Sequence, residues 1–340
     1  MNVALTGASG FVGQHLLPQL DAVADRVVAF DVRDPARRSH HLEFHRLDVA
    51  GTELKPLLEG VDVLVHLAAV GDPIPDERLM AHVNVEGTRH LLDAASAVGI
   101  RKVVRVSSAA VYGAWPNNPV PLTEDAVVRP NEGFAPAVQA AEAERLLVEW
   151  AGARPGAVAT VLRTAPVLGP GAEHLAVRML AGRPPLRIRG AAPPLQFVHV
   201  DDVVAALVLA VREDLPGAYN LAADGWLGTE EVRALVPRHL ALPLPPELAE
   251  RLLRALWASG LGDVPPTVLP YLIHPWVVAN DRLRSAGWAP VHTNEEAVVA
   301  GLASMPTSPS AARALLAAGG AALVGAAVLG WRRHRRHRRG

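Results

Sequence analysis

The chain has 340 residues, half of them hydrophobic and a fifth charged, which excludes a mainly disordered protein and leaves room for a large buried core. It has no cysteine, so disulfide bonds, thiolate metal sites and cysteine nucleophiles are excluded. The nine C-terminal residues carry six of the arginines, so the other 331 residues have a net charge of about −7, which argues against nucleic-acid binding.

The first 167 residues alternate short apolar runs with stretches of helical spacing. The predicted strands are Asn2–Thr6, Arg26–Asp31, Glu43–Leu47, Val61–His66, Lys102–Ser107 and Ala157–Arg163. The predicted helices include Phe11–Val23, Glu77–Val98 and Ala137–Ala153. Apolar strands separated by helices are typical of a parallel sheet covered on both faces, and right-handed crossovers then give a doubly wound, Rossmann-like α/β fold.

From about Leu168 proline and glycine become frequent, which predicts a smaller, irregular lobe over residues 168–303. Within it, residues 195–223 contain a helical pattern (FVHVDDVVAALVLAV) and a strand pattern (GAYNLA) and are expected to return to the main sheet. A polar linker at 304–310, an apolar helix at 311–331 and a basic tail at 332–340 complete the predicted organisation.

The segment TGASGFVG follows the first predicted strand and opens the first predicted helix. There, the free N–H groups and dipole of a helix N-terminus favour the pyrophosphate of a dinucleotide. Gly7 allows the tight turn, Gly10 lets the backbone approach the phosphates, and Gly13 permits close packing of helix on strand. Residues 1–167 are therefore predicted to bind a dinucleotide; an ordinary glycine-rich turn is the alternative.

The second predicted strand ends in Asp31, 21 residues after Gly10. A carboxylate at this position can accept hydrogen bonds from both adenosine ribose hydroxyls and repels the 2′-phosphate of NADP, which favours NAD. Arg33 is close enough in sequence to pair with that phosphate, so NADP is the alternative cofactor.

These motifs resemble those of the extended short-chain dehydrogenases, the NAD-dependent epimerase/dehydratase group, over residues 1 to about 303. Further matching segments are LDV, HLAA, NVEGT, VSSAAVYG, LRTAPVLGPG, QFVHVDDV, GAYNLA and SAGWAP. The resemblance implies that the cofactor contacts Gly7, Ser9, Gly10, Phe11, Val12, Gly13, Asp31, Arg33, Asp48, Val49, Leu67, Ala68, Ala69, Asn84, Ser107 and Pro166. It also implies a sugar-nucleotide or another carbonyl or hydroxyl compound as substrate, and it is compatible with a homodimer.

The chain departs from the family pattern at the catalytic residues. The family uses a serine and a Tyr-x-x-x-Lys pair, in which the tyrosine transfers a proton and the lysine lowers the tyrosine pKa. Ser108 matches the serine, but aligning AEAERLL places Pro136 at the tyrosine position and Ala140 at the lysine position. A shifted alignment places Phe134 and Val138 there, which restores neither group.

No other part of the sequence supplies this pair. None of the three tyrosines, Tyr112, Tyr219 and Tyr271, has a lysine four residues later, and the two lysines lie on a crossover helix and on the fifth strand. Because a general acid/base contributes about 10²–10⁴-fold, ordinary hydride-plus-proton chemistry is expected to be severely impaired. An enzyme with a non-standard proton source and a non-catalytic NAD-binding sensor or scaffold at the membrane both remain open.

Other polar residues are interpreted as structural. The 14 histidines show no metal-ligand spacing, so no metal site is predicted. His66 is expected to be a buried strand-end residue and His199 a positioned loop residue, while Asp201 and Asp202 are expected to cap the following helix.

The C-terminal residues Ala314 to Trp331 are 18 residues without a charge, just long enough as a helix to span a hydrocarbon core. A spanning helix would carry the arginines across the membrane against the positive-inside tendency, whereas a shallow helix would place them on anionic headgroups. Without a signal-peptide pattern at the start, we expect a cytoplasmic protein held on membrane lipid. A spanning helix and an ordinary packed helix are the alternatives.

Overall fold

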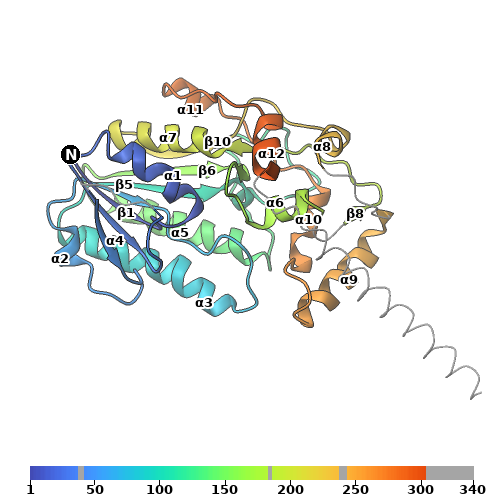
Figure 1. The fold of residues 1–340 in the computed structure, drawn as a ribbon, viewed down its shortest axis with the longest axis horizontal. Helices are drawn as coiled ribbons and strands as arrows, with labels where there is room; N and C mark the ends of the chain where they lie inside the picture. Colours follow the sequence, from blue (N-terminus) through green and yellow to red (C-terminus); the bar gives the residue numbers. More distant parts are fainter. Residues whose placement is uncertain (37–41, 183–185, 237–242, 304–340) are drawn as a thin grey trace, which may run out of the picture. The chain divides into compact units, whose positions relative to one another are not determined.

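A computed structural model describes residues 1–36, 42–182, 186–236 and 243–303, which belong to one compact unit (Figure 1). The predicted linker, apolar helix and basic tail lie outside the described residues. Within the described ranges, no helix is both long enough and apolar enough to cross a membrane.

A seven-stranded sheet forms the centre of this unit, and every pairing in it is parallel. In spatial order its strands are β10 (Gly217–Leu221), β6 (Val158–Thr164), β5 (Lys102–Ser108), β4 (Val63–His66), β1 (Asn2–Thr6), β2 (Arg26–Asp31) and β3 (Leu42–Arg46). All predicted strands are confirmed to within two residues. The chain order reverses between β1 and β4, and ligands of such folds bind at this switch point, outside the carboxyl ends of the strands.

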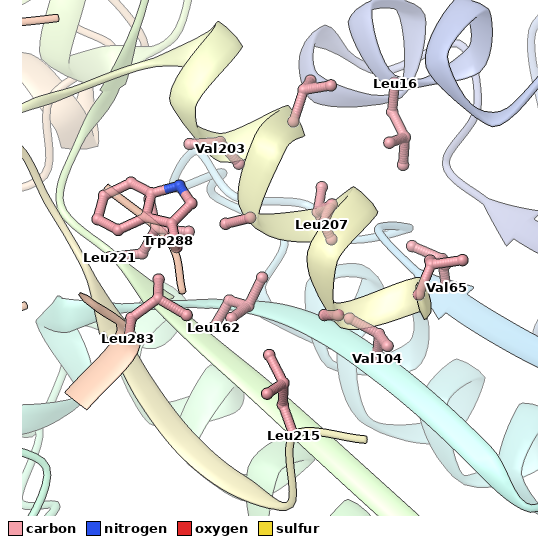
Figure 2. Packing of buried hydrophobic residues seen from close by; sticks show 14 of the residues in the cluster. Leu16, Val65, Val104, Leu162, Val203, Leu207, Leu215, Leu221, Leu283 and Trp288 are labelled. Atoms are coloured by element: carbon pink, nitrogen blue, oxygen red, sulfur yellow. The ribbon is translucent and has the colours of Figure 1, made fainter. Parts of the chain in front are cut away.

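Helices cover both faces of the sheet because the side chains of each strand point alternately to one face and the other. On one face lie α1 (Phe11–Leu20) and α7 (Val200–Arg212); on the other lie α2 (Lys55–Leu58), α4 (Gly87–Ala97) and α5 (Ala135–Gly152). Figure 2 shows the first layer, where helix side chains Leu16, Val203 and Leu207 pack over the strand residues Val65, Val104 and Leu162. The same cluster includes Trp288, which follows α11 (Asp281–Ser285).

The predicted helix Glu77–Val98 is confirmed over Glu77–Ala97, but a π-helical turn interrupts its α-helical spacing. It consists of α3 (Glu77–Ala81), a π-helical turn η1 (His82–Glu86) and α4. A π turn inserts one residue into the helical spacing and is frequent at functional sites. Here it turns Asn84 inward, where the side-chain amide hydrogen-bonds both backbone groups of Val70 (2.7 and 3.1 Å).

The smaller lobe is built from short helices and two-residue strands, and it has no large sheet among the described residues. Its helices are α6 (Leu175–Leu180), α8 (Thr229–Leu235), α9 (Pro246–Ala258), η3 (Pro266–Val268), α10 (Leu269–Ile273) and α12 (Asn294–Ala303). Two-residue strands pair as β7 (Val167–Leu168) with β9 (Val198–His199), and as β8 (Arg187–Ile188) with β11 (Pro243–Leu244). A separate hydrophobic cluster joins α6, α9 and α10 to the first turn of α5.

A buried ion pair connects α5 to the sheet. Glu144 and Arg163 are only 5% and 8% exposed, and the Arg163 Nη2 donates to Glu144 Oε2 at 2.8 Å. The Ser107 hydroxyl donates to the other Glu144 oxygen at 2.5 Å, and Arg163 Nη1 donates to the Tyr112 hydroxyl at 2.8 Å. Because both charges are removed from water, burying either one without its partner would cost about 3–5 kcal/mol of folding free energy.

Glu144→Gln should lower the free energy of unfolding by about 3–5 kcal/mol, because it leaves the Arg163 guanidinium buried without a counter-charge. Urea denaturation followed by circular dichroism measures the loss. Glu142→Gln is the matched control on the same helix; it removes a solvent-screened partner of Arg145 and should change stability much less. Equal losses in the two variants would contradict the dependence of α5 on the buried pair.

Candidate active site

The loop between β1 and α1 is shaped by glycines. Gly7 has φ +72°, and a Cβ there would lie 2.6 Å from the backbone nitrogen of Ala68, so only glycine fits. A Cβ on Gly13 would lie 2.2 Å from the Gly7 carbonyl oxygen, and its absence brings α1 against the loop. A Cβ on Gly10 would meet only the Gly7 oxygen, at 3.1 Å, and Gly10 lines a cavity. The loop thus presents backbone at the N-terminus of α1.

Asp31 holds this loop from the end of β2. Its carboxylate accepts the Ser9 N–H at 2.9 Å and the Arg33 N–H at 3.0 Å, and the Ser9 hydroxyl donates to the Arg33 carbonyl at 2.7 Å. A carboxylate has about four lone-pair sites, so acceptor capacity remains for ribose hydroxyls. The Arg33 side chain is 71% exposed, with its Nε 4.0 Å from Asp31.

The backbone after β4 forms the facing wall. The Leu67 N–H donates to the Thr6 carbonyl at 3.1 Å and the Ala68 N–H to the Thr6 hydroxyl at 3.2 Å, which fixes this segment to β1. Asp48, after β3, is exposed and accepts the Ala50 N–H at 2.9 Å, while Val49 is buried.

His66 is buried at the end of β4, as predicted, and lies between two hydroxyls. Its Nδ1 lies 2.7 Å from the Thr6 hydroxyl and its Nε2 lies 2.9 Å from the Thr88 hydroxyl. Burial, and then the charge of Arg105, lowers the pKa of His66 well below its usual value. His66 is therefore a neutral link between β1, β4 and α4.

A cavity of about 1150 Å³ opens at the carboxyl ends of the strands and continues into the smaller lobe. Predicted cofactor contacts that line it are Gly7, Gly10, Phe11, Val12, Gly13, Leu67, Ala69, Asn84, Ser107 and Pro166. Predicted contacts outside its lining are Ser9, Asp31, Arg33, Asp48, Val49 and Ala68. Asp31 ends β2 and Asp48 follows β3, on the side of the switch point where the fold places the adenosine half of a dinucleotide.

Ser108 ends β5 at the cavity. Its hydroxyl oxygen accepts the Ala110 N–H at 3.1 Å and starts the 3₁₀ turn η2 (Ala109–Tyr112). Pro136 and Ala140, on the first two turns of α5, line the same cavity. Neither side chain carries a proton that it can exchange, so the α5 wall contributes no acid or base at these positions.

Tyr271 is a cavity residue that sequence reasoning set aside. It comes from α10, packs on Phe134 with ring centroids 4.8 Å apart, and donates its hydroxyl to the Ala110 carbonyl at 2.9 Å. Burial raises the pKa of Tyr271 well above its usual value. Tyr112 is also buried, with a raised pKa, and bonds Asn220 and Arg163 instead of lining the cavity. Neither tyrosine has the activated phenol that the family chemistry requires.

Arg105 brings a positive charge to the cavity from β5 and was also missed. The side chain is 3% exposed; its Nη1 donates to the Thr88 hydroxyl at 3.2 Å, and its Nε has no hydrogen-bond partner. Burial lowers the pKa of Arg105 to about 10, although the charge of Glu144 opposes this shift. An arginine inside the apolar run KVVRVSS was the available sequence signal.

The expected cap of α7 is wrong. His199 is the capping residue: its Nδ1 accepts the Asp201 N–H at 3.2 Å. Asp202 instead accepts the N–H groups of Val291 and His292 at 2.8 and 3.1 Å, because that returning segment brings unpaired donors to the buried carboxylate. Because this segment lies about 90 residues downstream, no local sequence pattern indicates the contact.

His199, Asp201 and His292 form the one group in the described ranges whose ligand atoms lie close enough for a metal ion. The two imidazole rings are stacked, with centroids 3.9 Å apart and planes inclined by 22°. The lone pairs of stacked imidazoles lie in nearly parallel planes, whereas tetrahedral ligation needs them to converge on one point. The geometry therefore favours a structural contact between α7 and the segment before α12.

The family model of the NAD dependent epimerase/dehydratase family matches residues 3–222, nearly two thirds of the chain. The chain belongs to this family. The match covers the glycine loop, the cavity wall after β4, Ser108 and β10, so the sheet and the site belong to one family architecture. A nicotinamide dinucleotide is therefore the cofactor.

Relatives in the family differ in their named activities. A 3-diazoavenalumate denitrifying reductase from a Streptomyces species is 34% identical over 327 residues, covering 86% of this chain and 97% of the relative. A UDP-glucose 4-epimerase from Mycolicibacterium smegmatis is 30% identical over 291 residues, covering 77% and 90%. The structure of a Thermus thermophilus UDP-glucose 4-epimerase in complex with NAD has the same fold, with TM-score 0.70, 24% identity, and coverage of 89% and 98%.

Gly10→Val should abolish measurable NADH binding, because its side chain enters the cavity, and should disturb the fold less than a change at Gly7, since a Cβ on Gly10 meets one backbone atom, at 3.1 Å. Gly7→Ala should instead destabilise the protein by about 1–3 kcal/mol, since its Cβ overlaps the backbone of Ala68 at a positive φ. Fluorescence titration with NADH and thermal unfolding separate the two effects. Unchanged NADH affinity in Gly10→Val would show that the glycine loop does not bind the cofactor.

Proposed function

We propose that this protein is an NADH-dependent reductase that transfers hydride from the nicotinamide to a substrate in the smaller-lobe half of the cavity. The cavity joins the glycine loop and Ser108 to the lobe, so a cofactor and a substrate can share it. The 34%-identical relative, which spans most of both chains, is named as a reductase.

The observation that carries this proposal is that Pro136 and Ala140 line the cavity shared with Ser108. Epimerisation through a keto intermediate begins by oxidising a hydroxyl group, which needs a base to take the hydroxyl proton. Reduction of a carbonyl begins with hydride addition, which a hydrogen bond to the carbonyl oxygen assists, and water supplies the proton. Ser108 can donate that bond, so reduction is the direction that this site supports better.

For a carbonyl substrate the reaction balances as one carbonyl, one NADH and one proton giving one alcohol and NAD⁺. The hydride forms the new C–H bond, the carbonyl oxygen receives the proton, and the nicotinamide is oxidised. A sensor without catalysis is less well supported, because the cavity extends beyond the loop that holds the cofactor.

Ser108→Ala should slow single-turnover NADH oxidation by about 10–100-fold, with NADH affinity unchanged, because it removes the hydrogen bond to the developing oxyanion. Stopped-flow absorbance with a panel of carbonyl compounds measures the rate, which should stay well below the ~10 s⁻¹ typical of enzymes. Tyr271→Phe tests whether this tyrosine replaces the missing family tyrosine as proton donor, and it should change the rate little. A larger loss in Tyr271→Phe than in Ser108→Ala would make Tyr271 the proton donor.

We further propose that NAD is preferred to NADP. The support is Asp31, whose carboxylate is held beside the loop by Ser9 and Arg33 backbone groups and would lie next to a 2′-phosphate. The Arg33 Nε already lies 4.0 Å from Asp31, so the positive charge of Arg33 is partly offset and attracts a 2′-phosphate less.

Asp31→Ser should shift the ratio of NADPH to NADH affinity toward NADPH by at least about tenfold, equivalent to about 1.4 kcal/mol, because it removes the repelling charge. Dissociation constants for both cofactors, measured by fluorescence, test this. Asp34→Ser, a nearby exposed carboxylate, is the control and should leave the ratio unchanged. Tighter NADPH than NADH binding in the unmodified protein would mean that Arg33 dominates.

A further inference from the structure

The smaller-lobe half of the cavity is lined by apolar side chains from several separate segments. They include Phe134, Leu175, Ile188, Phe197, Val268 and Trp276. Most of them belong to the hydrophobic cluster that holds the lobe together, so the wall is the exposed side of a packed core. A ligand against this wall gains by removing apolar surface from water.

Asp72 occupies hydrogen-bond donors at the start of α6 that could otherwise bind a phosphate group. Its Oδ1 accepts the Leu175 N–H at 2.9 Å, at the start of α6, and its Oδ2 pairs with Arg178 at 2.9 Å. Arg178 also pairs with Asp263 at 2.7 Å. Asp72 lines the cavity, so its carboxylate repels an anion there and already accepts the Leu175 N–H and one N–H of Arg178.

Three cationic side chains line the cavity among the described residues, and none is set up for a diphosphate. Arg105 is buried and hydrogen-bonds the Thr88 hydroxyl. Arg233 is paired with Glu230. Arg187 is exposed on a two-residue strand, so water screens its charge. A nucleoside diphosphate placed against the apolar wall would lose its hydration without receiving charge-assisted hydrogen bonds in return.

From these contacts we infer that the substrate is an apolar organic compound, aromatic or aliphatic, without a phosphate or nucleotide group. The inference deepens the proposed function and rests on it only for the placement of substrate in this cavity. The reducible group of such a compound lies at the Ser108 end, and its apolar body lies along the lobe.

The test uses the full chain saturated with NADH. Nile red, a neutral apolar dye, should bind with a fluorescence increase. Calorimetry with UDP-glucose and with UMP should show no binding at about 1 mM, a concentration that would detect a dissociation constant of roughly 1 mM. Met179→Glu and Leu272→Glu, both on half-buried cavity residues, should each weaken dye binding at least about tenfold. Val299→Glu, outside the cavity and 53% exposed, should leave it unchanged.

NADH affinity, measured in every variant, shows that the fold is retained, and using two cavity variants guards against one that fails to fold. Micromolar binding of UDP-glucose, or displacement of the dye by UDP-glucose, would overturn the inference, and so would equal loss of dye binding in Val299→Glu. Failure of NADH to bind or to be oxidised would contradict the proposed function instead, while the dye and nucleotide titrations would still decide the chemistry of the cavity.

Discussion

The backbone of the loop after β1 lies so close to the backbone after β4 that no side chain fits at Gly7. This contact sits where the sheet reverses its order, and Thr6 fixes it by hydrogen-bonding Leu67 and Ala68. Because the two backbones meet here, the N-terminus of α1 is exposed to the cavity and Asp31 is brought beside the loop. The position of the dinucleotide, and therefore of anything that reacts with it, depends on this approach.

Charge is distributed unusually around this point. Arg105 on β5, Arg163 on β6 and Glu144 on α5 are all buried, and Arg105 also lines the cavity. On α5, where the family chemistry needs a phenol and an ammonium group, Pro136 and Ala140 stand instead. The cavity therefore retains the positive charge of Arg105, whereas Pro136 and Ala140 have no proton to exchange. Hydride transfer is the chemistry least affected by that combination.

The two halves of the cavity have opposite chemistry for a physical reason. The cofactor half consists of strand ends and a helix N-terminus, which offer backbone N–H groups. The lobe half is made of short segments that have no large sheet to bury them, so their apolar side chains pack on one another and on any ligand between them. Its apolar lining therefore follows from the way these short segments pack.

The sequence alone determined the sheet, the glycine loop and the place of Asp31, because these depend on short-range patterns: apolar runs, glycine spacing and a strand-end carboxylate. Which distant residues meet depends instead on how the elements pack in three dimensions. Tyr271 and Asp72 reach the cavity from segments about 200 positions apart, and Asp202 pairs with a segment some 90 residues later. The π turn at Asn84 likewise depends on packing against Val70 and Gln139. Such contacts carry no local periodicity, since their energy comes from burial and hydrogen bonding between elements that fold together only in three dimensions.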